Sequence, residues 1–364
     1  MSYKQELQNN NADLQSVLDT VNSLSTKRKP KFPNGTEWTQ SNIANYNFTC
    51  IRYANGIWVA GCNSSYDYGG LYYSTDGKTW IQSNVTNINI NFIHNGNGIW
   101  VASDFADNVY HSTDGISWTK ANIVSDGVFY RPNYIYYANG IWVACGSNYL
   151  YYSTDCTTWK KSNALHEFNF ARYANGIWVA GSYESKGIYY STDGKYWIKS
   201  NITSGNVNFA HYANGIWVAA HQANGLYYST DGKTWTQSNI TDVGFYMAYY
   251  ADGIWVAGGN QNAGLYYSTD GISWTQSNIT SDKVAFRRHS IYYASGIWVA
   301  CIHNYDNNGG LYYSTDGKTW TQSNVNNIGF YEAYNANGIW VACGSNSSNT
   351  GKGIYYSVTW EPSE

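Results

Sequence analysis

The sequence predicts an all-β fold, an eight-bladed β-propeller of four-stranded blades, and three observations support this prediction. The phrase "NGIWVA", or a near copy, occurs eight times at intervals of 36 to 43 residues. A second phrase, "YYSTDGKTW", alternates with it and forms seven complete Ser-Thr-Asp boxes. Aromatic residues make up 18% of the chain, which also has 35 glycines and only 4 prolines. This composition suits short strands joined by tight glycine turns.

Each repeat predicts four short strands. In one unit these are "NFARYANG" (169–176), "GIWVAG", "GIYYST" and "YWIKSN". The Asn-Gly between the first two strands is a strong signal for a two-residue hairpin. Apolar and aromatic residues occupy both faces of the strands, so both faces should be covered. A unit of roughly 40 residues with two buried faces, repeated along the chain, is typical of a propeller blade.

The two ends of the repeat region predict how the ring closes. The segment "PNGTEWTQSN" (33–42) matches the second half of a box and a fourth strand. The chain stops with "GIYYSVTWEPSE" (353–364), which has a third strand but no Asp-Gly turn. We therefore expect residues 36–42 to supply the outer strand of the eighth blade, within a propeller domain spanning residues 33–364.

The Ser-Thr-Asp boxes predict structural turns. The aspartate carboxylate and serine hydroxyl can bind nearby backbone N–H groups, and the glycine supplies a positive φ. In one box Cys156 replaces that glycine, so its turn should be strained. The seven predicted structural aspartates are Asp76, Asp114, Asp155, Asp193, Asp231, Asp270 and Asp316.

The boxes resemble the Asp-box, or bacterial neuraminidase repeat, proteins. The signature of that family is Ser-x-Asp-x-Gly-x-Thr-Trp, and "STDGKTW" (74–80) is one residue shorter between Asp and Gly. The resemblance covers about nine-tenths of the chain and implies a propeller. It implies no single activity, because the repeat occurs in enzymes, lectins and adhesins.

Residues 1–32 differ from the repeats and predict a helical docking or oligomerisation segment followed by a linker. Leu7, Leu14 and Val21 lie seven residues apart, as in a short coiled coil. The alternative is a helix that packs on its own propeller. The opening resembles anchors of tail-associated proteins of phages and prophages of gut Firmicutes, and the repeats resemble domains of phage tail fibres. These resemblances imply other virion proteins as partners through residues 3–25, and a homo-oligomer, with a trimer as one option.

Composition and charge exclude several functions. The net charge is -3 without a basic tract, so we expect no nucleic-acid partner. No apolar run is long enough for membrane insertion, and no secretory signal is apparent. We therefore expect synthesis in a host cytoplasm and a function on a virion or another extracellular assembly. The six cysteines contain no C-x-x-C pair, which favours small buried side chains over metal or disulfide use.

Variable loops predict the binding end of the propeller. The Asn-Gly turns and the boxes should lie at one end, and loops of varied length at the other. Variable loops on a rigid scaffold are common binding sites. Their tyrosines lie beside acidic or amide groups, which suits sugars, although surface tyrosines covering the propeller edge are the alternative. The candidates are Tyr66, Asp67, Tyr68, Tyr183, Glu184, Tyr305 and Asp306, and Phe105 is a further loop aromatic.

A second candidate site is a ring of polar and aromatic residues on the predicted inner strands. Its charged or titratable members are Arg52, His94, Arg172 and His211, each two residues before "ANG" or its equivalent. The ring either binds a ligand at the channel mouth, or its members satisfy each other around a wet channel.

No motif predicts catalysis, a metal or a cofactor. A sialidase needs an arginine cluster, a Tyr–Glu pair and an aspartate, and here only Tyr331 beside Glu332 resembles that pair. We therefore expect a non-enzymatic, tail-associated virion protein whose loops bind a host-surface receptor, either a glycan or a protein, with a glycan favoured. The alternatives are a purely structural or decoration protein of the virion and a sialidase-like glycoside hydrolase.

Overall fold

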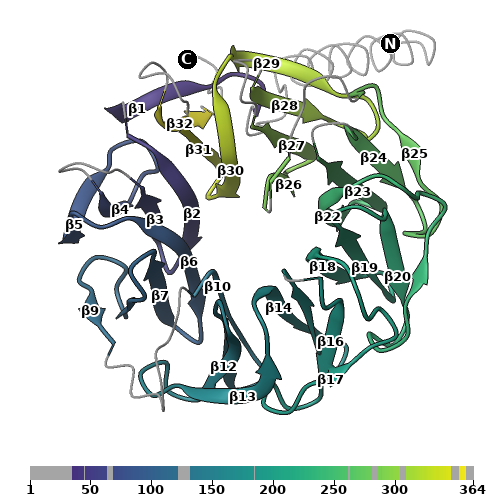
Figure 1. The fold of residues 1–364 in the computed structure, drawn as a ribbon. Helices are drawn as coiled ribbons and strands as arrows, with labels where there is room; N and C mark the ends of the chain where they lie inside the picture. Colours follow the sequence, from purple (N-terminus) through teal and green to yellow (C-terminus); the bar gives the residue numbers. More distant parts are fainter. Residues whose placement is uncertain are drawn as a thin grey trace, which may run out of the picture.

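The computed structural model is a ring of eight antiparallel four-stranded sheets around a central channel (Figure 1). It describes residues 35–44, 46–63, 69–121, 132–183, 185–260, 263–280, 286–287, 289–303, 309–345 and 352–357. The predicted helical segment and linker at residues 1–32 lie outside these ranges. Within the described residues all regular elements are strands, and none is a helix that is long and apolar enough to cross a membrane.

Blades 1 to 4 follow one another along the chain, each with four strands running outward from the channel. Blade 1 contains β2 (Phe48–Ala54), β3 (Ile57–Cys62), β4 (Gly70–Ser74) and β5 (Ile81–Thr86); blade 2 contains β6 (Ile90–Gly96), β7 (Ile99–Asp104), β8 (Val109–Ser112) and β9 (Thr119–Lys120); blade 3 contains β10 (Tyr134–Ala138), β11 (Ile141–Cys145), β12 (Tyr149–Ser153) and β13 (Lys160–Leu165); blade 4 contains β14 (Phe168–Ala174), β15 (Ile177–Ser182), β16 (Ile188–Ser191) and β17 (Ile198–Lys199).

Blades 5 to 8 continue the same order, and the last blade also takes the first strand of the chain. Blade 5 contains β18 (Val207–Ala213), β19 (Ile216–His221), β20 (Leu226–Ser229) and β21 (Thr236–Gln237); blade 6 contains β22 (Phe245–Ala251), β23 (Ile254–Gly259), β24 (Leu265–Ser268) and β25 (Thr275–Gln276); blade 7 contains β26 (Ile291–Ala294), β27 (Ile297–Ile302), β28 (Gly310–Ser314) and β29 (Thr321–Asn326); blade 8 contains β30 (Gly329–Ala336), β31 (Ile339–Ser345), β32 (Gly353–Ser357) and β1 (Thr39–Ala44).

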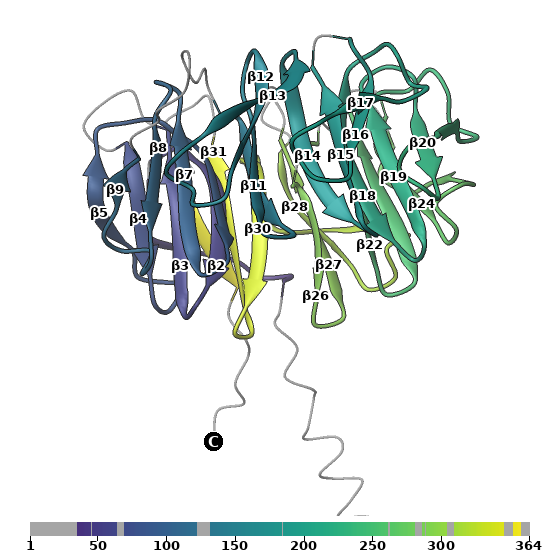
Figure 2. The same cartoon turned by 90° about the horizontal axis from the view of Figure 1, so that it is seen from below.

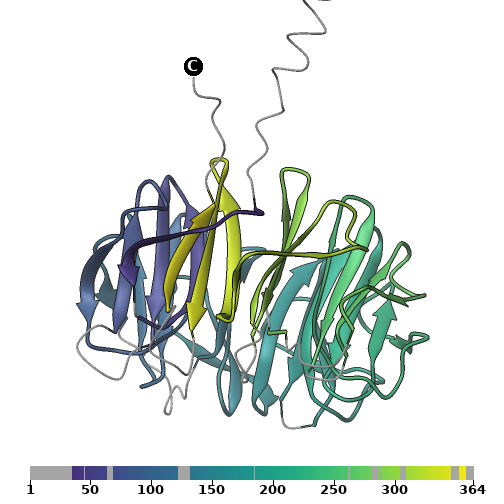
Figure 3. The same ribbon diagram turned by 90° about the horizontal axis from the view of Figure 1, so that it is seen from above.

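The predicted two-residue hairpins are confirmed at the inner strands of all eight blades. Both turn residues have a positive φ, as at Asn55 (53°) and Gly56 (83°), which is the geometry of a type I′ turn. Figures 2 and 3 show two of these hairpins, β26–β27 and β30–β31, projecting at the same end of the ring. We call this end the hairpin end and the opposite one the loop end.

The predicted closure of the ring is confirmed. β1 pairs with β32 in antiparallel register, with Thr39 opposite Tyr356 and Ala44 opposite Gly353. Ahead of β1, the Trp38 indole Nε1 donates to the Gly35 carbonyl (2.8 Å), as six box tryptophans do to the carbonyl of the residue three positions earlier, which is the box glycine in five blades and Cys156 in blade 3. Both described chain ends, Gly35 and Ser357, therefore lie at the hairpin end.

A network of side-chain bonds builds each of the seven Ser-Thr-Asp boxes. In blade 5 the Asp231 carboxylate accepts from the Lys233 and Thr234 backbone N–H groups, both at 2.8 Å. The Ser229 hydroxyl donates to the same carboxylate (3.0 Å) and accepts from the Gly232 N–H (2.9 Å). The other six boxes repeat the two backbone bonds.

We expect these boxes to make the protein sensitive to acid. Partial burial alone would raise the pKa of Asp231, but the N–H and hydroxyl donors outweigh it and lower that pKa below 3.8, and the other box aspartates shift the same way. A lowered folded pKa stabilises the fold above the ordinary pKa, and the benefit is lost as pH falls through the folded value. The thermal midpoint should therefore fall below about pH 4.

The variant Asp231→Asn tests this acid sensitivity. It keeps an acceptor oxygen but no longer titrates, so its midpoint should depend less steeply on pH between about 2 and 4 than that of the parent. Asp242→Asn, at an exposed position outside the boxes, is the control. Equal slopes for all three proteins would contradict a role for the box carboxylates.

Cys156 adopts the strained conformation that the sequence predicts. Its φ is 65°, whereas the box glycines have φ between 70° and 74°. A left-handed backbone costs a non-glycine residue about 1–2 kcal/mol. We expect Cys156→Gly to raise the free energy of unfolding by about 1 kcal/mol or less, because loss of the buried thiol offsets part of the relief. Chemical denaturation measures the change, and a lower stability would show that thiol packing dominates.

Asparagine side chains join neighbouring blades on the outer side of the ring. In each such clasp the amide accepts from the backbone N–H of a box tryptophan in the next blade and donates to its carbonyl, at 2.7–3.1 Å. The seven described clasps are Asn42–Trp80, Asn84–Trp118, Asn163–Trp197, Asn201–Trp235, Asn239–Trp274, Asn278–Trp320 and Asn324–Trp38. Two of the seven depend on the segment that holds β1.

The core lies between the blades. The tryptophan, valine and alanine of each "IWVA" strand are buried, as Trp58, Val59 and Ala60 illustrate. The six cysteines are free and buried, which confirms the prediction of small core side chains. Burial on both faces explains why these strands read as continuous apolar runs.

Candidate binding site

Bulges in the inner strands shape the channel at the loop end. In six blades the register between the first two strands shifts by one residue, which leaves an extra residue near the start of the inner strand. A bulge bends the strand and redirects that side chain. The extra residues are Thr49, Asn91, Asn169, Asn208, Tyr246 and Tyr331.

Four of the bulge side chains hydrogen-bond to the next blade. Thr49 Oγ1 donates to the Ile90 carbonyl (3.0 Å), and Asn91 Nδ2 donates to the Asn133 side-chain oxygen (2.9 Å). Asn169 and Asn208 donate to the carbonyls of Val207 (3.0 Å) and Phe245 (2.8 Å). The remaining two, Tyr246 and Tyr331, line a cavity, and so do Thr49 and Asn91.

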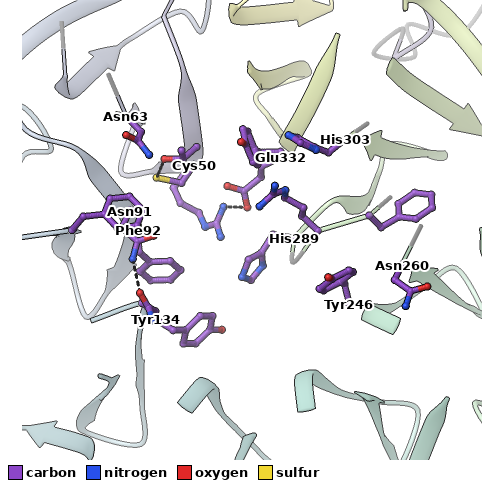
Figure 4. Close-up of a pocket in the computed structure, with 17 residues that line it drawn as sticks. Cys50, Asn63, Asn91, Phe92, Tyr134, Tyr246, Asn260, His289, His303 and Glu332 are labelled. Carbon is purple, nitrogen blue, oxygen red and sulfur yellow. Dashed lines mark hydrogen bonds and ion pairs between the residues drawn. The ribbon is translucent and has the colours of Figure 1, made fainter. Parts of the chain in front are cut away.

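The cavity occupies the channel at the loop end and has a volume of about 690 Å³ (Figure 4). This size lies within the range of small-molecule sites, about 300–1,000 Å³. Its lining combines aromatic rings, carboxamides and a few charged or titratable groups. The lining residues are Phe92, Phe105, Tyr134, Tyr246, Phe286 and Tyr331; Asn63, Asn91, Asn133 and Asn260; Arg52, Arg287, Glu332, His289 and His303; and Thr49 and Cys50.

An ion pair between the first and last blades forms one half of the cavity floor. Arg52 of β2 donates from Nη1 to Glu332 Oε1 of β30, and the Ile51 N–H donates to Glu332 Oε2 (2.9 Å). Burial raises the pKa of Glu332, and the charge of Arg52 and these two donors oppose that shift. Burial alone would lower the pKa of Arg52, but Glu332 raises it. Arg52 therefore stays protonated.

Aromatic and cationic side chains from other blades form the other half of the floor. The His289 ring lies parallel to that of Tyr134 (centroids 5.9 Å apart) and edge-on to Phe209 (5.5 Å). Arg172 lies between these partners, since its Nε donates to the Tyr134 hydroxyl (3.0 Å) and its guanidinium is 4.3 Å from the Phe209 ring centroid. His289 lies just before β26 of blade 7 and has a φ of 65°. Because its ring contacts Tyr134 of blade 3 and Phe209 of blade 5, the side chain reaches across the channel.

Tyr331 lies between a cation and an imidazole in the cavity wall. The Arg287 guanidinium is 4.8 Å from the Tyr331 ring centroid, and the His303 ring is 4.9 Å from it. Burial, followed by the charge of Arg287, lowers the pKa of His303 to about 4. His303 is therefore neutral at physiological pH and can both donate and accept a hydrogen bond.

The structure describes the four charged or titratable members of the predicted inner-strand ring. Arg52 lines the cavity and Arg172 supports its floor. His94 and His211 instead pack between rings, each 5.1 Å from a neighbouring tyrosine, Tyr136 and Tyr249. Burial and nearby arginine charge lower the pKa of both histidines to about 3.

Most of the predicted loop candidates lie outside the described residues. These are Tyr66, Asp67, Tyr68, Glu184, Tyr305 and Asp306. Tyr183 is described and exposed on the loop after β15, but it does not line the cavity. Phe105, also named among the loop aromatics, does line it.

The sequence pattern singled out Tyr331 and Glu332 only as a sialidase-like pair, and it did not single out the other five bulge residues or Arg287, His289 and His303. The bulge position carried a detectable signal, because it holds threonine, asparagine or tyrosine three residues before the predicted ring position. The other three lie in or beside loops that no repeat phrase marks.

Comparisons with known proteins identify similar folds. No known protein-family profile and no curated protein sequence matches the chain. The computationally designed Ika8 protein is similar, with a TM-score of 0.65, 10% identity and coverage of 87% of this chain and 98% of that one. YCF48 bound to D1 peptide has a TM-score of 0.55 and 15% identity, with coverage of 74% of this chain and 92% of that one. Saccharomyces cerevisiae Sqt1 has a TM-score of 0.53 and 12% identity, with coverage of 70% of this chain and 79% of that one. At these identities the similarity concerns the fold alone.

Proposed function

We propose that this chain is a non-enzymatic binding protein whose loop-end cavity takes part of a glycan on a host surface. The observation that carries the proposal is the cavity of about 690 Å³ at the mouth of the channel. We further propose that the protein belongs to the tail of a phage or prophage virion. The resemblance of its repeats to Asp-box and tail-fibre propellers, and of residues 1–32 to virion anchors, supports this part.

The lining chemistry favours a sugar. Six aromatic rings and four carboxamides converge on one cavity. An aromatic ring packs against the apolar face of a sugar, while amide and hydroxyl groups exchange hydrogen bonds with its hydroxyls. Tyr246 and Tyr331 are half-buried, which leaves part of each ring exposed toward the cavity.

The placement of the two described chain ends supports presentation of the cavity to a surface. Gly35 and Ser357 lie at the hairpin end, and the cavity lies at the loop end. An attachment through residues 3–25 would therefore hold the protein from the side opposite its binding site. Several copies on one virion would raise weak individual affinities through avidity.

Three other functions are outcomes of the test. A solved structural neighbour, YCF48, is bound to a peptide, so a peptide or protein receptor is one alternative. A glycoside hydrolase is another, but the cavity carboxylate Glu332 already accepts bonds from Arg52 and Ile51, which favours a structural role for it. A structural virion protein would bind neither class.

The experiment is a glycan array probed with the full-length protein and three tyrosine variants. We expect glycan binding that Tyr246→Ala and Tyr331→Ala each weaken by about tenfold or more, through loss of ring contact. Tyr196→Ala, at an exposed box position of the hairpin end, is the matched control and should bind normally. Absence of glycan binding by a folded protein would refute the proposal, and release of fluorophore from a glycoside panel would make the protein an enzyme.

A further inference from the structure

We infer that the cavity is a well closed at its floor, so that it recognises the terminal sugar of a glycan rather than an internal segment. This inference rests on the proposed function and specifies which part of the glycan the cavity would bind. It depends on three features of the described residues: a floor that spans the channel, walls that surround the space above it, and a mouth at the loop end.

The floor closes the channel from two sides. On the side of blades 8 and 1, the Glu332 carboxylate and the Arg52 guanidinium are joined, and Arg52 Nη1 also donates to the Ile51 carbonyl (2.7 Å). On the side of blades 3 to 5, His289 packs on Tyr134 and Phe209. Figure 4 shows the His289 ring between Glu332 and Tyr134, near the middle of the space that the lining residues surround.

The other members of the inner-strand ring stand at the same strand position as Arg52 and Arg172 and extend this layer around the channel. Neighbours in this layer touch around much of the ring, with centroids 5.1 Å apart for His211 and Tyr249, 5.6 Å for Tyr249 and Tyr292, and 4.8 Å for Tyr292 and Tyr334. Of the ring residues, Arg52 alone lines the cavity. Among the described residues, the lining of the cavity therefore ends at the level of this ring.

The walls and mouth come from separate blades. Asn91 and Asn133 line the cavity from blades 2 and 3. Tyr246 lines it from blade 6 and Tyr331 from blade 8. Asn63, which follows β3 at the loop end, also lines the cavity. A ligand thus enters from the loop end and meets polar groups on several sides before it reaches the floor.

A closed well selects for chain ends on geometric grounds. An internal segment of a polymer needs two exits from its site, one for each direction of the chain. A well with one mouth accepts a terminal unit and leaves the rest of the chain outside. Surface glycans are attached through their reducing ends, so the terminus available to the well is the non-reducing one.

The test compares chain ends with internal repeats, using probes of known structure. The probes are array oligosaccharides coupled through their reducing ends, long linear polysaccharides of the same repeat, and methyl glycosides of the terminal monosaccharide as competitors. We expect the methyl glycoside to compete at a concentration within about tenfold of that of the oligosaccharide, because the units outside the well add little. Binding should follow the number of chain ends.

Two outcomes separate this inference from the proposed function. Glycan binding that follows the number of internal repeats, with no competition by any methyl glycoside, would overturn the closed well and leave glycan binding intact. No binding to any glycan would refute the proposed function itself.

A floor variant provides a second measurement. His289→Asn shortens the side chain, and asparagine tolerates the left-handed backbone of this position. We expect it to weaken binding of the methyl glycoside by about tenfold while the thermal midpoint stays close to that of the parent. His111→Asn, on β8 and outside the cavity lining, is the control. Unchanged affinity in a folded His289→Asn protein would contradict a ligand that reaches the floor.

Discussion

Deletion of residues 1–44 should prevent the protein from forming a stable closed ring. The deletion removes β1, which pairs with β32 as the outer strand of blade 8. It also removes Trp38 and Ile43, which are both buried, and it breaks the clasps Asn324–Trp38 and Asn42–Trp80.

The expected loss is large because several terms add. Burial of a large apolar side chain contributes about 1.5–3 kcal/mol, and each hydrogen bond contributes about 1 kcal/mol. Two side chains, four clasp bonds and one strand ladder therefore amount to about 7 kcal/mol or more, comparable with a total stability of about 5–15 kcal/mol. The exposed edge of β32 would in addition favour aggregation.

Thermal unfolding of residues 45–364 measures the effect, with residues 33–364 as the matched control. The control retains Gly35, Trp38 and all of β1, so it should unfold within a few degrees of the full chain. We expect the shorter fragment to be insoluble or to melt about 10 °C or more lower. Equal midpoints for the two fragments would contradict closure by β1.

Closure and blade number could be predicted from the sequence because their signals are local and repeated. Each Asn-Gly turn requires two positive φ values, and each box places its serine, aspartate and glycine at fixed spacing. The half box at Gly35–Trp38 was recognisable for the same reason. Comparison with the seven complete boxes shows that the last unit lacks its Asp-Gly turn and its fourth strand. The sequence that matches this fourth strand lies near the start of the repeat region, at residues 36–42.

The cavity could not be predicted in the same way, because it depends on departures from the repeat. From the sequence, side chains along the inner strand are expected to alternate strictly between its two faces. Thr49 and Tyr331 are the extra residues of bulges, so their side chains depart from that alternation. His289 reaches the channel through a left-handed backbone that no local sequence signal indicates. The ion pair of Arg52 and Glu332 joins residues 280 positions apart, so only the closed ring brings them together.

That ion pair leads to the second large expected effect: Glu332→Gln should destabilise the protein by about 3–5 kcal/mol. The substitution keeps an oxygen that can accept from the Ile51 N–H, but it removes the negative charge beside Arg52. The Arg52 side chain is only 14% exposed, so its charge would remain buried without a counter-ion. Leaving one member of a buried pair behind costs about this much, whereas the intact pair itself contributes little net stability.

A double variant distinguishes this mechanism from simple loss of packing. Glu332→Gln combined with Arg52→Met removes both charges, keeps the acceptor for Ile51 and fills a similar volume. Because no buried charge is then unpaired, we expect the double variant to recover most of the stability that the single variant loses, as measured by chemical denaturation. A single variant within about 1 kcal/mol of the parent, or a double variant no more stable than the single one, would show that Arg52 and Glu332 are not coupled in the folded protein. The floor of the cavity would then lose one of its two supports, and with it the closed shape on which terminal-sugar recognition depends.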